Sequence, residues 1–334
     1  MSYSLKKRIL YIIVGLVSLI SVSKAQDPIY TQFYANPLYL NPALTGVEKC
    51  PRFVMNYRNQ WPGLNNGNGN YVTYSASYDQ NVDALSGGLG VLLMQDREGS
   101  NGVFKTTRAT LMYSYNLNVN RKLSFRFGLS AAYFQKSIDW GQLTFGDQID
   151  ERYGFVYNTQ ETEPQKNVQG VDFGAGFLAY TKYFYGGFAV DHLTEPSEKF
   201  LLADDTKLPR KLTAHAGFVI PINKRHPEDG ALSPNIMYQS QGQAFSGAPT
   251  ANQLFLGLYG YKGPIVGGMW WRGRDAFAVL VGIKTDHVRF GYSYDITYSK
   301  LTNKSGGSHE VSLALIFNCK PKKKVFRPLT CPKF

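Results

Sequence analysis

The stretch Leu123-Ser124-Phe125-Arg126-Phe127-Gly128-Leu129-Ser130-Ala131-Ala132-Tyr133 alternates large apolar side chains with small or polar ones. Successive side chains on a β-strand point to opposite faces, so this stretch predicts a strand with one apolar face. The same period of two recurs at 277–284, 288–295 and 311–317. The chain is also rich in Tyr (23), Phe (21) and Gly (33). Aromatic residues favour strands and frequent Gly disfavours helices, so the pattern predicts an all-β fold.

A soluble β-sandwich would show the same alternation, so the choice of architecture depends on the second face of each strand. That face is rich in Gly, Ala and Ser, which indicates tight curvature or a narrow, filled lumen. Aromatic residues also gather near strand ends, as they do at both interfaces of membrane barrels. Examples are Tyr113, Tyr183, Trp270, Trp271 and Tyr292. We therefore expect a transmembrane antiparallel β-barrel.

Fourteen strands are expected, and an even number brings both termini to the periplasmic side of an outer-membrane barrel. The connections agree, because 117–121, 262–263 and the single residues Lys182 and Asp286 would be short periplasmic turns. The long segments 136–169 and 193–209 would be external loops, whereas 221–232 is longer than a periplasmic turn should be. The expected strands are 51–60, 70–79, 87–95, 104–116, 122–135, 170–181, 183–192, 210–220, 233–241, 251–261, 264–272, 276–285, 287–295 and 309–318.

The first 25 residues are typical of a secretory signal peptide. Lys6, Lys7 and Arg8 precede an apolar run over 9–22, and Ser23-Lys24-Ala25 supplies small residues for cleavage before Gln26. The alternative is a membrane anchor, but fourteen residues rise only about 21 Å as a helix, against roughly 30 Å of hydrocarbon. We therefore divide the chain into a signal at 1–25, an N-terminal segment at 26–49, a barrel at 50–318 and a tail at 319–334.

The charge of the chain is strongly basic. Four positive charges leave with the signal (Lys6, Lys7, Arg8 and Lys24), so the formal charge falls from +12 to +8. A basic cytoplasmic protein would suggest nucleic acid, but an exported one rarely meets it. An acidic polypeptide or a lipopolysaccharide-type surface is the better expectation, with outer-membrane lipid around the barrel and no nucleic-acid partner.

Several basic residues fall on the face opposite the lipid, where few acids beyond Asp172 and Asp295 accompany them. A charge facing hydrocarbon would cost a few kcal/mol near the bilayer midplane, so these residues should face the lumen. They form either a hydrated wall or a pore lined for acidic or polar polypeptide. The basic residues are Arg52, Arg58, Arg108, Arg126, Lys211, Lys284 and Arg289.

The segment between the signal and the first strand contains Asn36-Pro37 and Asn41-Pro42. Neither pair can lie inside a helix or a paired strand. Asn41 can cap one helical turn with Pro42 at its first position and Gly46 as a left-handed stop. We expect a compact segment that packs inside the periplasmic mouth of the barrel, which is wide enough to leave a gap there.

This segment resembles the start of the PorP/SprF family, outer-membrane proteins of the Bacteroidetes type IX secretion system. The resemblance rests on Gln32-Phe33, Asn36-Pro37 and the run Leu40-Asn41-Pro42-Ala43-Leu44-Thr45-Gly46, and it extends through the Gly/aromatic strands. It implies a barrel that cooperates with the secretion machinery. Some members act with periplasmic ring and peptidoglycan-binding components, and SprF-like members serve export or surface retention of one large cargo, such as a gliding adhesin.

The C-terminal tail carries six basic residues and three prolines, so it should lie in the periplasm outside the barrel. It is either a solvated tail or a contact strip for an acidic periplasmic protein, with Phe326 and Phe334 as apolar anchors. We assign Lys322, Lys323, Lys324, Phe326 and Arg327 to this contact. The other candidate partner-binding residues are Asn36, Pro37, Asn41, Pro42, Gly46, Arg108, Arg126 and Arg289.

The three cysteines allow one disulfide with one thiol left over. Barrel closure brings the first strand beside the last one, so Cys50 and Cys319 should be neighbours at the periplasmic end. We expect a disulfide that involves Cys50, with Cys319 slightly favoured over Cys331.

No motif for catalysis or cofactor binding is found. The five histidines are dispersed, and His215 should have a structural role on the lumen face. Gly87-Gly88-Leu89-Gly90 precedes a strand instead of a helix, so it is no phosphate cradle. Asp204-Asp205 offers too few oxygens for calcium. We expect neither an enzyme nor a cofactor or metal.

Three functions fit these observations. The first is a secretion and anchoring partner that binds a large secreted cargo through the C-terminal domain of that cargo. The second is a structural component that links the outer membrane to the periplasmic secretion ring. The third is a small-solute or lipid porin, which would not need the Asn-Pro segment. We favour the first, and we expect the 136–169 loop, with Glu151, Glu161 and Glu163, to contact a protein at the cell surface.

Overall fold

The structure is a computed structural model that describes most of the chain. The described residues are 27–64, 71–150, 152–161, 165–200, 207–223, 225–226, 229–242, 251–273, 275–299 and 302–319. Residues 1–25, which the sequence predicts to be a signal peptide, lie outside these residues, as do most of the basic tail, Glu151, Glu163, Asp204-Asp205 and the third cysteine, Cys331. Within the described residues, no helix is both long enough and apolar enough to cross a membrane.

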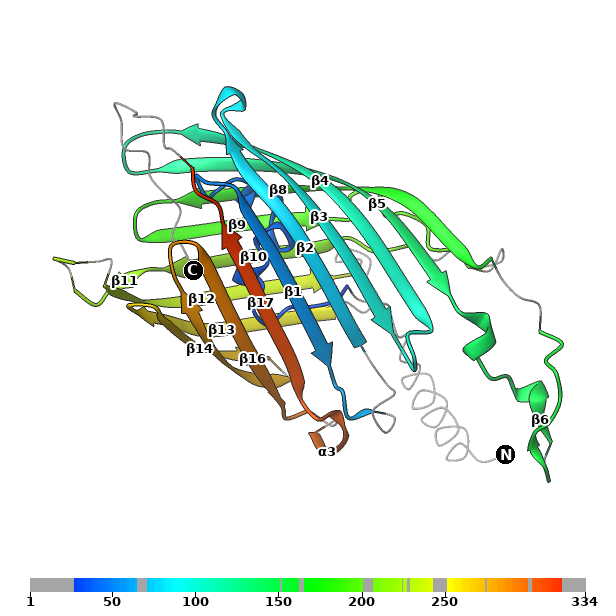
Figure 1. The fold of residues 1–334 in the computed structure, drawn as a ribbon. Coiled ribbons are helices and arrows are strands. Elements are labelled where there is room, and N and C mark those ends of the chain that lie inside the picture. The colour runs from blue at the N-terminus through cyan, green and yellow to red at the C-terminus, as the bar shows by residue number, and fades with distance from the viewer. Residues whose placement is uncertain are drawn as a thin grey trace, which may run out of the picture.

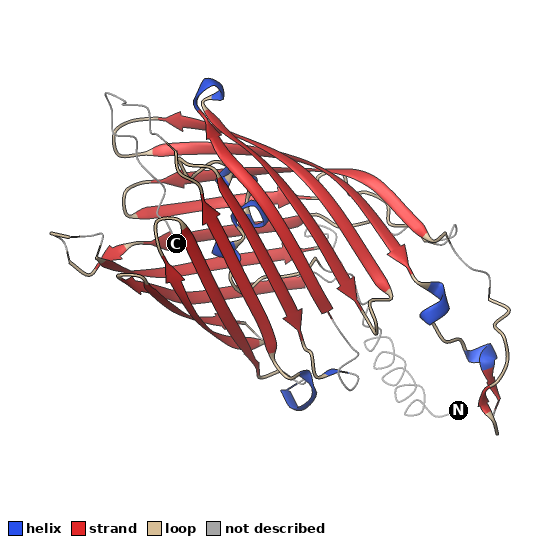
Figure 2. Cartoon of the chain, viewed as in Figure 1, coloured by secondary structure: helices blue, strands red, loops and turns tan. Residues whose placement is uncertain are grey.

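One antiparallel sheet closes on itself as a barrel (Figures 1 and 2). Among the described residues the sheet has fifteen strands, and one of them is the two-residue β11, so fourteen long strands form the wall. Each long strand pairs with its neighbours in the chain, and β1 pairs with β17. The strands are β1 (Arg52–Gln60), β2 (Tyr71–Val82), β3 (Gly87–Glu98), β4 (Phe104–Asn118), β5 (Ser124–Ile138), β8 (Asn167–Tyr180), β9 (Phe184–Asp191), β10 (Lys211–Phe218), β11 (Ile220–Pro221), β12 (Gly230–Gln241), β13 (Ala251–Lys262), β14 (Ile265–Arg272), β15 (Ala276–Lys284), β16 (Val288–Thr297) and β17 (Ser308–Ile316). The expected fourteen-strand barrel is confirmed.

The alternating pattern sets the direction of each side chain. In β5, Arg126 and Gly128 are buried inside the barrel, whereas Leu129 on the other face is 64% exposed. The same inversion holds on β4, where Leu111 is 64% exposed. A soluble protein buries such apolar side chains, so an outward apolar band is the arrangement that hydrocarbon lipid requires.

The two ends of the barrel differ in their connections. At one end the turns are short, and both β1 and β17 reach this end at Arg52 and Ile316; we call it the terminal end. The other end carries the loops 139–166 and 192–210, and we call it the long-loop end. The long connection expected at 221–232 is shorter in the structure, because β11 continues the line of β10 and β12 starts at Gly230.

The short elements outside the wall were not expected from the sequence, apart from one turn of the N-terminal segment. The 139–166 loop contains two single turns and a hairpin of two-residue strands. The 3-10 helices are η1 (Phe33–Ala35), η2 (Pro42–Leu44), η4 (Asp83–Leu85), η5 (Trp140–Gln142) and η6 (Gly146–Gln148); the α-helices are α2 (Pro37–Leu40) and α3 (Thr302–Ser305); and the hairpin pairs β6 (Ile149–Asp150) with β7 (Gly154–Phe155).

Cys50 and Cys319 form a disulfide at the terminal end, with their Cα atoms 5.4 Å apart. The two residues flank β1 and β17, which pair in antiparallel register from Arg52↔Ile316 to Gln60↔Ser308. The bond therefore fastens the two strands whose pairing brings the chain ends together.

Replacing both Cys50 and Cys319 with serine should lower the free energy of unfolding by about 2–4 kcal/mol, because the covalent link restricts the unfolded chain. Mass mapping under non-reducing conditions should recover the two cysteine-containing peptides joined. Chemical unfolding in detergent would measure the loss. Three free thiols in the wild-type protein would contradict this pairing.

Candidate functional site

Residues 27–48, which we call the plug, run through the lumen of the barrel. The Asn-Pro pairs set their local turns: Pro37 opens α2 and Pro42 opens η2. The side chain of Asn41 accepts a hydrogen bond from the backbone N–H of Ala43 at 2.9 Å, and Gly46 has a φ of 66°. The expected single turn, capped by Asn41 and stopped by Gly46, is confirmed.

The plug extends farther into the barrel than the mouth, where it was expected. Gly46 lies near the terminal end and donates its backbone N–H to Asp79 at 2.8 Å. Asp27 lies toward the opposite end, where its carboxylate is 3.0 Å from the amine of Lys211, the first residue of β10. The plug therefore spans much of the barrel length. It can do so because its short turns alternate with extended residues and do not form one compact unit.

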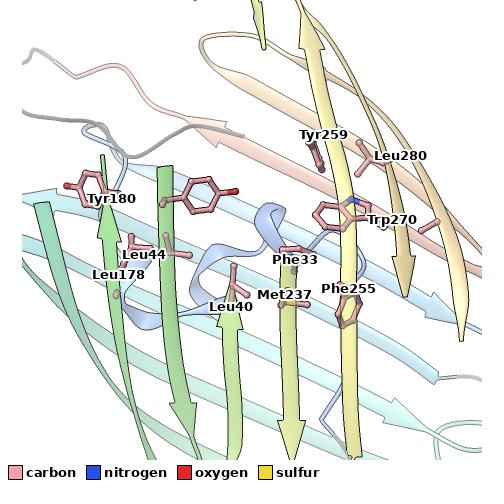
Figure 3. Close-up of a cluster of buried hydrophobic side chains, with 13 residues drawn as sticks. Phe33, Leu40, Leu44, Leu178, Tyr180, Met237, Phe255, Tyr259, Trp270 and Leu280 are labelled. Atoms are coloured by element: carbon pink, nitrogen blue, oxygen red, sulfur yellow. The ribbon is translucent and has the colours of Figure 1, made fainter. Parts of the chain in front are cut away.

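One side of the plug packs against an apolar part of the wall (Figure 3). The ring centroid of Phe33 is 4.6 Å from that of Trp270 and 6.0 Å from that of Phe255. Leu40 and Leu44 belong to the same buried cluster. Burial of these side chains from water stabilises the plug by about 1.5–3 kcal/mol for each large side chain.

Wall glycines make room for the plug at its closest approach. A Cβ atom at Gly128 would lie 2.2 Å from the backbone nitrogen of Ala43, and one at Gly176 would lie 2.0 Å from the side-chain oxygen of Asn41. Neither distance is possible for real atoms. The small residues on the inner face therefore indicate a filled lumen, which is one of the two interpretations of the sequence pattern.

A buried ionic cluster holds the plug at Thr31 and Gln32. Glu310 accepts hydrogen bonds from the backbone N–H groups of both residues, at 2.8 and 2.9 Å. Arg58 donates to Glu310 at 3.0 Å and to Asp295 at 2.9 Å, and it also donates to the Thr31 hydroxyl. The side chains of Arg58, Asp295 and Glu310 are at most 1% exposed. Charge-assisted bonds of this kind are about twice as strong as neutral ones.

A second ionic cluster surrounds Asp27. Its carboxylate contacts the Lys211 amine and, at 2.9 Å, the Nε2 atom of His192. The Nδ1 atom of His192 lies 2.6 Å from Asp172, which also pairs with Arg108. Burial disfavours the charged carboxylate, but Lys211 and His192 hold the pKa of Asp27 well below its usual value. Burial also disfavours the imidazolium, but Asp27 and Asp172 raise the pKa of His192 to about 9.

Three further arginines contact the plug or the residues beside it near the terminal end. Arg126 donates to the backbone carbonyl groups of Ala43 and Thr45. Arg289 pairs with Glu48 at 2.7 Å. Arg52 forms two hydrogen bonds to Asp79, the residue that also accepts from Gly46. Arg126 thereby supplies donors to two buried backbone carbonyl groups, and that of Thr45 also accepts from the Ser114 hydroxyl.

The structure assigns the candidate partner-binding residues of the plug and wall to contacts within the chain. Asn36 donates to Ser75, and Asn41 contacts the carbonyl groups of Phe177 and Phe188 and the ring of His215. Pro37 and Pro42 are buried, and Gly46, Arg108, Arg126 and Arg289 bind as described above. Lys322, Lys323, Lys324, Phe326 and Arg327 lie outside the described residues.

The lumen does not carry the excess of positive charge that the sequence suggested. The expected basic side chains do lie inside, but acids that were not foreseen neutralise them: Asp79 pairs with Arg52, Glu310 with Arg58, and Glu48 with Arg289. Lys211 pairs with Asp27 and Asp191. In this structure these basic side chains therefore contact paired acids and the plug, while a pore lined for acidic or polar polypeptide stays a prediction.

Two small cavities lie between the plug and the wall. A cavity of about 60 Å³ lies between the plug and the wall beside Tyr34, Tyr259 and Leu280, and another of about 30 Å³ lies beside Asp27. Each holds a few water molecules at most. Among the described residues, no group of three or more His, Cys, Asp or Glu side chains is arranged to hold a metal ion.

The Asp27 cluster predicts how plug anchoring depends on pH. The pKa of His192 is about 9 in the folded protein and about 6.5 in the unfolded chain. The contribution of His192 to the free energy of unfolding is therefore complete below about pH 6.5 and is lost as the pH rises through 9. We expect the free energy of unfolding of the wild type to fall by about 2 kcal/mol between pH 7 and 9.5. A His192→Gln variant should lack this loss. Unfolding midpoints in detergent across that range would measure it, and parallel curves for the two proteins would contradict the assignment.

The family model of the type IX secretion system membrane protein PorP/SprF matches residues 22–315. No significant match to a curated protein is found.

Three solved structures are among those that are similar to this chain. The CymD monoaromatic hydrocarbon channel is 14% identical with a TM-score of 0.48, over 85% of this chain and 93% of that chain. The Pseudomonas putida toluene transporter TodX is 10% identical with a TM-score of 0.47, over 84% and 93%. A Pseudomonas aeruginosa FadL homologue is 11% identical with a TM-score of 0.44, over 83% and 93%. Because the family match covers most of the chain, this protein belongs to the PorP/SprF family of type IX secretion system membrane proteins.

Proposed function

We propose that this barrel binds a large secreted cargo protein through the C-terminal domain of the cargo and supports its export or surface anchoring, as a gliding adhesin would need. The observation that carries the proposal is the plug, which fills the lumen with residues of the chain itself. A polypeptide cannot share that space. Within a secretion system, the contribution of the barrel therefore comes from its two ends and not from a conduit through it.

The lengths of the connections support one orientation of the barrel in the membrane. We place the terminal end, with the Cys50–Cys319 disulfide, in the periplasm and the 139–166 and 192–210 loops at the cell surface. Bacterial outer-membrane barrels have short periplasmic turns and longer external loops, and the connections of this barrel divide in that way. The cargo contact then lies on the long-loop end. The proposal includes no catalytic step, because the family is one of secretion-system membrane proteins.

A structural link to the periplasmic secretion ring is the second candidate. Basic side chains exposed at the terminal end favour it, namely Lys49, Arg121, Lys122, Lys182 and Lys262. The disulfide also fixes the start of the basic tail at this end, and we assign Lys322, Lys323, Lys324, Phe326 and Arg327 to an acidic periplasmic partner. A small-solute porin is the weakest candidate, because its lumen would have to be open.

Deletion of the gene, followed by quantitative mass spectrometry of the culture medium and the cell surface, tests the proposal. Loss of a single large secreted protein, restored by the wild-type gene, would support the cargo-specific role. Loss of many secreted proteins together would assign the barrel to the core machinery. An unchanged set of secreted proteins would contradict both.

A pull-down of the tagged protein in mild detergent separates the two roles physically. A cargo-specific barrel should retain the same protein that the deletion strain fails to export. A structural component should retain periplasmic ring proteins, and a chain truncated after Cys319 should lose them if the basic tail makes the contact.

A further inference from the structure

The 139–166 loop carries an exposed apolar surface that the plug and the wall do not use. We call the described residues of the hairpin β6–β7 and the two residues after it the loop knob, that is, residues 149–150 and 152–157. Within it Ile149 is 50% exposed, Tyr153 70%, Phe155 64%, Val156 55% and Tyr157 56%. Figure 1 shows β6 beyond the end of β5, away from the wall. Side chains there do not face the hydrocarbon that surrounds the strands, so their exposure has another cause.

The knob has a fixed shape because hydrogen bonds within the loop hold it. Asp150 accepts from the backbone N–H groups of Arg152 and Tyr153 and from the hydroxyl of Tyr157, at 2.8 to 3.0 Å. Ile149 and Phe155 are register partners across the hairpin, so their side chains lie on the same face. A surface that is ordered before binding loses less conformational entropy when a partner docks.

The base of the loop is ordered as well. Asp147 accepts from the Thr159 hydroxyl and from the backbone N–H of Gln160. The ring centroids of Trp140 and Phe145 lie 4.6 Å apart. The Asp147 bonds join the two arms of the loop below the knob, and the ring contact of Trp140 with Phe145 orders the first arm.

The charge around the knob selects the kind of partner. The sequence of the 139–166 loop has six acids, namely Asp139, Asp147, Asp150, Glu151, Glu161 and Glu163, against the two bases Arg152 and Lys166. The rest of the exported chain is basic, so this concentration of acids is local. A membrane surface of phosphate head groups would be repelled, whereas a protein surface rich in Lys and Arg would be attracted.

We propose that the loop knob is the cargo-docking element, and that its aromatic side chains insert into an apolar depression rimmed by Lys and Arg on a folded domain of the secreted protein. This inference depends on the proposed function and gives it a location. The strands of the hairpin have two residues each, too few for the partner to extend the sheet. Side chains therefore carry the contact, and Tyr and Phe anchors at the centre of an interface commonly supply most of its binding energy.

The test uses the full chain in lipid nanodiscs and, as probe, the purified secreted protein that is lost when the gene is deleted. The double variant Tyr153→Ser, Phe155→Ser removes the two most exposed aromatic side chains of the knob. We expect its Kd for the probe to rise at least tenfold, which is about 1.4 kcal/mol. Glu161→Lys should also weaken binding, and the wild-type Kd should rise with salt concentration.

The matched control is Leu193→Ser, which removes an apolar side chain that is 40% exposed in the other long loop and should leave the Kd unchanged. Equal binding by the wild type and the double variant would overturn the knob proposal and leave the cargo-binding function standing. Failure of the wild-type barrel to bind the probe would overturn the proposed function, and the knob proposal with it. Tight binding of the wild type to probe-free phosphatidylglycerol vesicles, lost in the double variant, would assign the knob to lipid instead.

Discussion

Replacing Gly128 and Gly176 with alanine should convert a closed barrel into a conducting one. A Cβ atom at Gly128 would lie 2.2 Å from the Ala43 nitrogen and 2.3 Å from the Pro42 carbonyl carbon, both backbone atoms. At Gly176 it would overlap the Asn41 side chain. Overpacking of this kind costs about 1–3 kcal/mol at each site. The strands are fixed by continuous hydrogen-bond ladders, so the plug should move and the wall should not.

Single-channel recording in planar lipid bilayers would measure the effect. The wild type should be silent, and the double variant should show conductance steps. The control is Gly267→Ala in β14, where a Cβ atom would meet only the Leu280 carbonyl oxygen, at 3.8 Å, and this variant should stay silent. A double variant that folds with native stability and remains silent would show that the plug contact near η2 does not close the barrel.

The plug also explains which wall features the sequence could predict. The strands could be predicted from the alternation of apolar and polar residues. A shift of one residue would turn the apolar side chains of a strand into the lumen, so the pattern fixes which side chains face outward. The sequence indicates a second face rich in Gly, Ala and Ser, but it leaves two explanations open, tight curvature and a filled lumen. Only the position of the plug against Gly128 and Gly176 shows that a filled lumen, and not curvature, accounts for these two residues.

The depth of the plug could not be predicted from its own residues. Asn-Pro pairs specify local turns through the fixed φ of proline and the capping oxygen of asparagine. They do not specify which part of the wall those turns contact. That information lies in Glu310 and Asp295, more than 260 residues away in sequence from Thr31, and no local pattern connects them.

The neutralising acids were missed although a signal for them exists. Glu310 shares its strand face with Ser308 and Ser312, and Asp79 shares its face with Ser75 and Ser77. Both therefore have the inward direction that was recognised for Arg58 and Arg52. If the inward or outward position in the strand alternation is read for acids as well as for bases, the sequence predicts paired charges inside the barrel. The hairpin in the 139–166 loop had no such signal, since strands of two residues carry no measurable period.

Arg58→Met should destabilise the folded barrel by about 3–5 kcal/mol, because it leaves two buried carboxylates without the cation between them. The guanidinium of Arg58 contacts Glu310 at 3.0 Å and Asp295 at 2.9 Å, and the nearest other cation, Arg272, is 3.4 Å from Asp295. Urea unfolding in detergent would measure the change.

The matched control is Arg97→Met. Arg97 is exposed, and among the hydrogen bonds of the described strands its side chain bonds only to Gln95. This variant should change the free energy of unfolding by less than about 0.5 kcal/mol.

A variant in which the two acids and the arginine are all made neutral shows whether Arg58→Met lowers stability by leaving buried charges unpaired or by removing packing contacts. In the triple variant Arg58→Met, Asp295→Asn, Glu310→Gln no buried charge lacks a partner, and the amide oxygen introduced at position 310 can still accept from the backbone N–H of Thr31 or Gln32. Replacement of a whole buried ion cluster is often close to neutral, whereas removal of one member is not. We therefore expect the triple variant to recover most of the stability that Arg58→Met loses. A triple variant as unstable as the single one would mean that Arg58 contributes through its packing volume and its bond to Thr31, and not through the charge of Asp295 and Glu310.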